Sequence, residues 1–195
     1  STVVELADGS LLQNMRSYSR TGHRAVAVSH DGGASWSPLQ WASTLIEPVC
    51  QASILRCTWP GNDQKSRILF SNPASAIRGK REKMTIRVSY DEGATWPVSK
   101  LIHAGPAAYS CLVMLPDQTV GCLYECGEDN PYEKIVLARM SLNWLEDATK
   151  GSTVMTPPQT ETTGTALNWK QLPPIPDNIG FASPFAGVSD GALIV

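Results

Sequence analysis

Apolar residues along the chain form short runs that alternate with turn-forming residues. These runs cover residues 3–6, 11–15, 25–29, 53–56, 67–71, 84–89, 111–115, 120–124 and 135–140. The segments between them contain Gly, Pro and Asp, for example ADG at 7–9, HDGG at 30–33 and PDQ at 116–118. Short strands bounded by such turns are typical of an all-β meander. No stretch of about 12 residues keeps the apolar period of a helix, so we expect little helix.

An internal repeat narrows the predicted fold. Residues 29–36 read SHDGGASW and residues 89–96 read SYDEGATW. In each copy the Asp can accept hydrogen bonds from turn amides, the Gly can take φ > 0, and the Trp can fold back over the hairpin. The structural positions are Ser29, Asp31, Gly33, Trp36, Ser89, Asp91, Gly93 and Trp96. The 60-residue spacing suits one four-stranded blade of a β-propeller with a loop insertion, so we predict a propeller with one hairpin lock per blade.

The composition is that of a globular protein. Of the 195 residues 42% are hydrophobic, and 16 Lys and Arg against 18 Asp and Glu give a net charge of -2. This balance excludes a strongly basic nucleic-acid-binding protein. The five cysteines form no CxxC pair and the three histidines are scattered, so we expect no metal and no cofactor, while a single disulfide such as Cys50 to Cys57 stays open.

Composition also divides the chain. Residues 1–146 carry the strand pattern, residues 147–168 are rich in Thr, Ser and Pro and are predicted to be a linker, and residues 169–195 resume a β-like pattern. The last run, GALIV, reads as an apolar strand with no partner left in the sequence. The chain starts at Ser1 without the features of a signal peptide, and no run approaches the ~18 apolar residues of a membrane span. From the start of the chain we expect either a cytosolic protein or one whose beginning is missing. The last run, without a partner, favours a chain that is cut at both ends.

Several ordered segments resemble the second half of an exo-α-sialidase (neuraminidase) of the bacterial and lysosomal type with Asp-box (BNR) repeats. Besides the two repeats, the segments are LLQNMRSYSRTGHRAVAVSHDGG, RILFSNPASAIRGKREKMTIRVSYDEGATW and GPAAYSCLVMLPDQTVGCLYECG. The resemblance covers residues 1–146. It implies a six-bladed β-propeller, of which this chain supplies about the last three blades. It also implies hydrolysis of terminal α-linked sialic acids on glycoproteins, glycolipids and oligosaccharides.

The resemblance assigns two arginines to the substrate's carboxylate. Sialic acid carries a carboxylate on its anomeric carbon, and the planar guanidinium fork suits such an anion. Arg16 matches the second of three family arginines, and Arg81 matches the third. A solvated strand-end cation is the alternative for Arg16, and a generic basic loop with Arg78, Lys80 and Lys83 is the alternative for Arg81.

The resemblance assigns two further catalytic residues, Tyr109 and Glu125. Tyr109 matches the family's nucleophile, and a neutral phenol can approach an anomeric centre whose own carboxylate would repel the usual carboxylate nucleophile. Glu125 matches an acid that orients one of the arginines. The alternatives are a packed tyrosine and an exposed strand-end acid. Glu47 and Gln51 are further candidates for lining the cavity, without a decisive argument.

Two expected residues fall outside the sequence. The Glu that deprotonates the tyrosine should stand immediately before Ser1, and the Asp acid/base should lie further upstream. We therefore expect these residues alone to be inactive. Residues 169–195 separately resemble the start of a kelch-type N-acetylneuraminate mutarotase/epimerase propeller.

Two other functions stay open: a non-catalytic sialic-acid lectin, and an Asp-box scaffold that binds proteins. The enzyme hypothesis predicts that Arg16, Arg81, Tyr109 and Glu125 lie near one another and away from Trp36 and Trp96. The expected partners are sialylated glycans, with no nucleic acid and no membrane span. A secreted, periplasmic or lysosomal parent protein is the default, because sialoglycoconjugates lie in those places.

Overall fold

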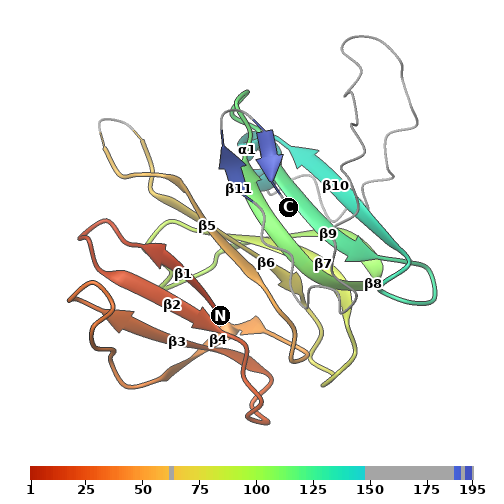
Figure 1. Cartoon of the computed structure of the whole chain (residues 1–195), viewed down its shortest axis with the longest axis horizontal. Helices are drawn as coiled ribbons and strands as arrows, with labels where there is room; N and C mark the ends of the chain where they lie inside the picture. Colours follow the sequence, from red (N-terminus) through yellow and green to blue (C-terminus); the bar gives the residue numbers. More distant parts are fainter. Residues whose placement is uncertain (62–63, 148–186, 190–191, 195) are drawn as a thin grey trace, which may run out of the picture.

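The computed structural model describes residues 1–61, 64–147, 187–189 and 192–194. Its first ten strands form one four-stranded and one six-stranded antiparallel sheet (Figure 1). The strands of the first sheet, in spatial order, are β1 (Thr2–Glu5), β2 (Leu11–Met15), β3 (His23–Ser29) and β4 (Gln40–Ile46). We call this sheet blade A.

The second sheet contains two successive blades that share one long strand. Its strands are β5 (Ser53–Thr58), β6 (Arg67–Pro73), β7 (Glu82–Ser89), β8 (Val98–Met114), β9 (Val120–Cys126) and β10 (Lys134–Met140). Residues 98–106 of β8 pair with β7, and residues 107–114 pair with β9. We call β5–β7 with residues 98–106 blade B, and residues 107–114 with β9 and β10 blade C.

The change of partner within β8 occurs next to Gly105 and Pro106. Proline lacks the N–H that a ladder hydrogen bond needs, so it is tolerated where a strand leaves one sheet for the next. The expected all-β fold and partial propeller are confirmed. The sequence pattern predicted no strand at β4 or at residues 98–110 of β8. The second of these segments contains Gly105 and Pro106.

Each pair of neighbouring blades encloses its own apolar core. Between blades A and B lie Val4, Leu6, Leu12, Leu45, Ala52, Ile54, Ile68, Phe70 and Trp96. Between blades B and C lie Leu69, Met84, Ile86, Val88, Ile102, Ala107, Leu112, Val120, Cys122, Tyr124, Cys126, Met140 and Leu145. Successive residues of β6 therefore face different cores, which explains why nearly the whole strand is buried.

The two Asp-box turns have the same hydrogen bonds. In the first, the Ser29 hydroxyl donates to Asp31 at 2.8 Å, and Asp31 accepts from the Ser35 amide at 2.8 Å. In the second, Ser89, Asp91 and Thr95 repeat these distances. The turn glycines have φ of 93° and 87°, a left-handed region that glycine adopts without steric cost.

The tryptophans of the repeat do more than cover their own hairpins. Trp96 is 7% exposed, and its ring centroid lies 5.7 Å from that of Phe70 in the core between blades A and B. Trp36, the equivalent residue of blade A, is 38% exposed. The Asp-box tryptophan thus packs between neighbouring blades, and within the described part of the chain only Trp96 has a blade on either side.

The end of the described propeller part is a short helix, α1 (Leu142–Glu146). Leu145 is fully buried in the core between blades B and C, and Glu146 accepts from Arg67 Nε at 2.6 Å. Most of residues 148–195, on which the linker and kelch-like predictions fall, lie outside the described residues. The expected unpaired last strand is a correction: β12 (Ala192–Ile194) pairs with β11 (Gly187–Ser189). All five cysteines are free, so there is no Cys50–Cys57 disulfide.

Candidate active site

The candidate site residues stand at one end of their strands and the Asp-boxes at the other. Arg16 follows β2, and Arg81 immediately precedes β7. The first Asp-box follows β3, whose last residue, Ser29, pairs with Leu11 at the start of β2. The second follows Ser89, eight residues beyond Arg81, which at about 3.3 Å per strand residue is a separation of roughly 25 Å. The scaffold turns are therefore remote from the candidate chemistry.

Arg81 and Tyr109 are adjacent. The guanidinium carbon of Arg81 lies 5.3 Å from the centroid of the Tyr109 ring, within the range of a cation–π contact. The backbone supports this arrangement, because the amide of Ala107 donates to the carbonyl oxygen of Arg81 at 3.0 Å. Burial acts to lower the pKa of Arg81, but its neighbours Cys50, Tyr132 and Tyr109 outweigh burial and raise it. The guanidinium is therefore a permanent cation beside the phenol.

Glu125 lies next to Tyr109 but contacts its backbone. One carboxylate oxygen of Glu125 accepts the amide hydrogen of Tyr109 at 3.0 Å. Within the described part of the chain, no arginine forms an ion pair with Glu125. The acid fixes the strand at Tyr109 and forms no ion pair with Arg16 or Arg81, so its expected role of orienting one of the family's three arginines stays a prediction.

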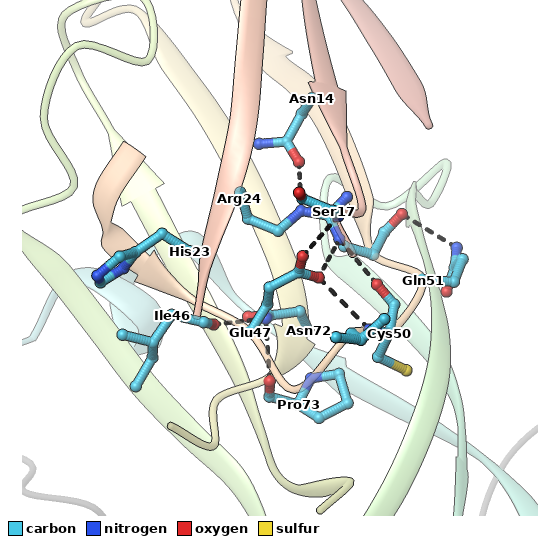
Figure 2. Close-up of polar contacts among 12 residues, drawn as sticks. Asn14, Ser17, His23, Arg24, Ile46, Glu47, Cys50, Gln51, Asn72 and Pro73 are labelled. Carbon is cyan, nitrogen blue, oxygen red and sulfur yellow. Dashed lines mark hydrogen bonds and ion pairs between the residues drawn. The ribbon is translucent and has the colours of Figure 1, made fainter. Parts of the chain in front are cut away.

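Arg16 stands beside a second buried network, shown in Figure 2. The amide of the next residue, Ser17, donates to Glu47 at 2.7 Å, and the other oxygen of Glu47 accepts from Arg24 at 2.8 Å. Arg24 also donates to Asn14 and to the carbonyl oxygen of Cys50, each at 2.7 Å. The Glu47 and Arg24 side chains are only 2% and 1% exposed. This ion pair fixes the backbone that presents Arg16.

Cys50 lies near both Arg24 and Arg81: Arg24 donates to its carbonyl oxygen at 2.7 Å, and Arg81 donates to that of the preceding residue, Val49, at 3.3 Å. Burial raises the pKa of the Cys50 thiol to about 11. Arg81 and Arg24 act to lower this pKa, and Glu125 acts to raise it. The thiol thus has all three of these charged groups within electrostatic reach. Arg16 likewise acts on Arg24, whose pKa is lowered mainly by burial.

The loop between blades A and B, residues 47–52, organises this region. Val49 has φ of 64°, which is unfavourable for a β-branched residue, and its carbonyl oxygen accepts from Arg81 at 3.3 Å. Gln51 clamps the residue after the candidate nucleophile: it accepts from the Ser110 amide and donates to the Ser110 carbonyl, both at 2.9 Å. Asn72 attaches the loop's entrance to blade B by donating to the Ile46 carbonyl at 2.9 Å (Figure 2).

Sequence reasoning missed Arg24 and left Glu47 and Gln51 undecided. A signal for Arg24 was present, because it has the same alternation phase as Val26 and Val28, which pack toward the core. A charge on the inward face of a strand needs a buried partner. Which acid supplies it was not readable, because Glu47 is 23 residues away in the sequence.

Comparisons with known proteins show the family of the chain. Residues 1–122 match the family model of the BNR repeat-like domain. The chain belongs to the BNR repeat-like family. A sialidase from Micromonospora viridifaciens is 44% identical over 145 residues, covering 73% of this chain and 21% of that protein. A sialidase from Bacteroides fragilis is 38% identical over 128 residues, covering 63% of this chain and 23% of the relative.

A solved structure gives the same picture for this BNR chain. The Hadza microbial sialidase Hz136 has a TM-score of 0.58 at 39% identity, over 70% of this chain and 26% of its own. The BNR chain thus spans about a quarter or less of the length of these relatives. Among the described residues, no helix is both long and apolar enough to cross a membrane.

Proposed function

We propose that, within a complete propeller, these residues form the C-terminal half of an exo-α-sialidase active site that cleaves terminal α-linked sialic acids with retention of configuration. The observation that carries the proposal is the contact between Arg81 and Tyr109, a permanent cation beside a phenol, at a distance of 5.3 Å. A carboxylate and the scissile bond share the anomeric carbon of a sialoside. A site for this substrate therefore needs its anion-binding group next to its nucleophile.

In this proposal each residue has one chemical role. Arg16 and Arg81 bind the substrate carboxylate. The Tyr109 oxygen attacks the anomeric carbon as the bond to the departing sugar breaks, and the Glu expected directly before Ser1 accepts the proton of the phenol. A general acid protonates the departing oxygen, and water then hydrolyses the tyrosyl-sialoside. Glu125 keeps Tyr109 in place through the backbone hydrogen bond at 3.0 Å.

The β1–β2 register supports the expected base. Thr2 pairs with Asn14, so a residue directly before Ser1 would continue the ladder opposite Arg16. A glutamate at that position would stand beside the carboxylate-binding arginine, as the hypothesis requires.

The first prediction tests the nucleophile. In a protein that carries these residues within a complete propeller, Tyr109→Phe should lower turnover of a fluorogenic sialoside by about 10³-fold or more, because the attacking oxygen is removed. Tyr90→Phe, at the Asp-box end of β7, is the matched control and should keep full activity. Unchanged turnover by Tyr109→Phe would refute the assignment, and wild-type binding of sialic acid without turnover would favour the lectin.

A further inference from the structure

Arg81 is held by two neutral acceptors. Its Nη1 donates to the Tyr132 hydroxyl at 2.6 Å, and its Nη2 donates to the Val49 carbonyl at 3.3 Å. No carboxylate of the described residues forms an ion pair with Arg81. Arg24, in contrast, is neutralised by Glu47. Arg81 is therefore oriented without losing its charge.

The loop that carries Tyr132 is itself firmly constructed. The Glu133 carboxylate accepts the amide hydrogens of Glu128, Asp129 and Asn130 at 3.0, 3.0 and 2.6 Å. These backbone hydrogen bonds, that of Glu128 first, lower the pKa of Glu133. The carboxylate thus stays ionised and keeps the loop folded around itself near neutral pH.

Two further contacts fix the loop relative to the site. The Gly127 amide donates to the carbonyl oxygen of Pro106 at 3.1 Å, where β8 passes from blade B to blade C. A Cβ at Gly127 would lie 1.9 Å from the Asn130 carbonyl oxygen, so only glycine fits there. The amide of Tyr132 donates to the Asn130 side chain at 2.9 Å. Tyr132 is 56% exposed, so its hydroxyl contact with Arg81 results from this loop rather than from burial.

We propose that Tyr132 is a positioning residue that pre-orients the Arg81 guanidinium for the substrate carboxylate. An arginine side chain loses rotamer freedom when it is fixed. Fixing it before the ligand arrives removes that cost from binding. A phenol hydroxyl can do this without competing for the positive charge, which a carboxylate would neutralise. The proposal rests on the proposed function, because it takes Arg81 as the group that binds the carboxylate.

The test compares wild type with Tyr132→Phe, which removes only the hydroxyl, in a protein that carries the complete propeller. The dissociation constant of free sialic acid should rise about tenfold, while that of its carboxyl methyl ester should stay within about twofold. In an Arg81→Lys background, Tyr132→Phe should add no further loss of affinity. Glu133→Gln, which weakens the loop, should weaken binding in the same direction but by less.

A second measurement separates the two proposals. The ¹⁵N order parameter of the Arg81 Nε–H, without ligand, should fall in Tyr132→Phe and stay unchanged in the control Tyr90→Phe. An unchanged order parameter together with unchanged affinity for sialic acid overturns the positioning role. A wild-type protein that binds no sialic acid, but whose Arg81 loses order in Tyr132→Phe, overturns the proposed function and with it the substrate of the positioning role, while the ordering of Arg81 by Tyr132 itself is upheld.

Discussion

At the scale of residues, the partners of an arginine distinguish a structural cation from one available to a ligand. Arg24 forms a buried ion pair with Glu47 at 2.8 Å, and both side chains are at most 2% exposed. Buried charges of this kind persist only when they are paired, since desolvation is costly. Arg81 is held by groups without charge. The same residue type therefore serves the fold in one place and the candidate chemistry in another.

The second prediction concerns the buried ion pair. Glu47→Gln leaves Arg24 buried without a counter-charge and should lower the free energy of unfolding by about 3–5 kcal/mol. Asp117→Asn is the control: it breaks the Arg139–Asp117 pair, whose side chains are 52% and 51% exposed, and should cost less than ~1 kcal/mol. Urea unfolding measures both. Equal, small losses would show that the buried pair is not needed.

The third prediction concerns acid stability. Hydrogen bonds from Ser35 and Ser29 lower the pKa of Asp31 from 3.8 to about 2. Because the folded-state pKa is below the unfolded value, this group's contribution is fully present above pH 4 and is lost as the pH falls towards 2. The melting temperature of the wild type should therefore decline over this window more steeply than that of Asp31→Asn. If the melting temperatures of the two proteins fell equally with pH, Asp31 would not stabilise the turn through its carboxylate.

At the scale of elements, the repeat shows how one sequence pattern has two energetic outcomes. Ser29 pairs with Leu11 and Ser89 pairs with Ile68, so the two motifs hold equivalent positions in blades A and B. The local hydrogen bonds are the same in both. Only burial differs, because blade A covers Trp96 whereas no blade formed by the described residues covers Trp36.

The fourth prediction uses this difference. Trp96→Ala should destabilise the chain by about 3–5 kcal/mol, the usual cost of removing a buried aromatic side chain. Trp36→Ala, with the same chemical change in an equivalent turn, should cost less than ~1 kcal/mol, because 38% of that residue is already exposed. The comparison is made by thermal and urea unfolding. Equal losses would mean that the tryptophan acts only within its own hairpin.

The strands that sequence reasoning missed share a physical cause. The burial pattern of β4 is mostly exposed, so it lacks the alternation that marks a half-buried strand. Residues 98–110 of β8 contain Gly105 and Pro106, which usually end a strand. Here they stand where the chain passes between blades, a place that only the tertiary structure reveals.

At the scale of the whole molecule, blade B has both faces covered, whereas the described residues cover blade A on one face only. Val4, Leu12 and Leu45 of blade A are buried against blade B. On blade A and its turn, Val3, Trp36, Leu39 and Trp41 are between 38% and 51% exposed. In an intact propeller a neighbouring blade would cover such a face. Exposed apolar surface of this kind promotes association.

The fifth prediction follows from this exposed surface. The 195-residue chain alone should self-associate at micromolar concentration and show no turnover. Replacing Val3, Leu39 and Trp41 with Ser should shift it toward the monomer in analytical ultracentrifugation. The control Ile77→Ser, which changes a residue that is 59% exposed on another loop, should leave association unchanged. A monomeric wild type would contradict the prediction.

The sequence by itself determined the strand-and-turn pattern, the paired Asp-boxes and the family resemblance, because these depend on local alternation, turn chemistry and motif order. The tertiary structure decided which distant residues meet. Arg81 meets Tyr109 and Tyr132, Arg24 meets Glu47, and Trp96 is buried while Trp36 is not. The Arg24–Glu47 pair depends on the pairing of β3 with β4, whereas the other contacts depend on how one blade packs against the next. Both join residues that are distant in the sequence, 23 to 51 positions apart for the hydrogen-bonded pairs, which no local pattern can match.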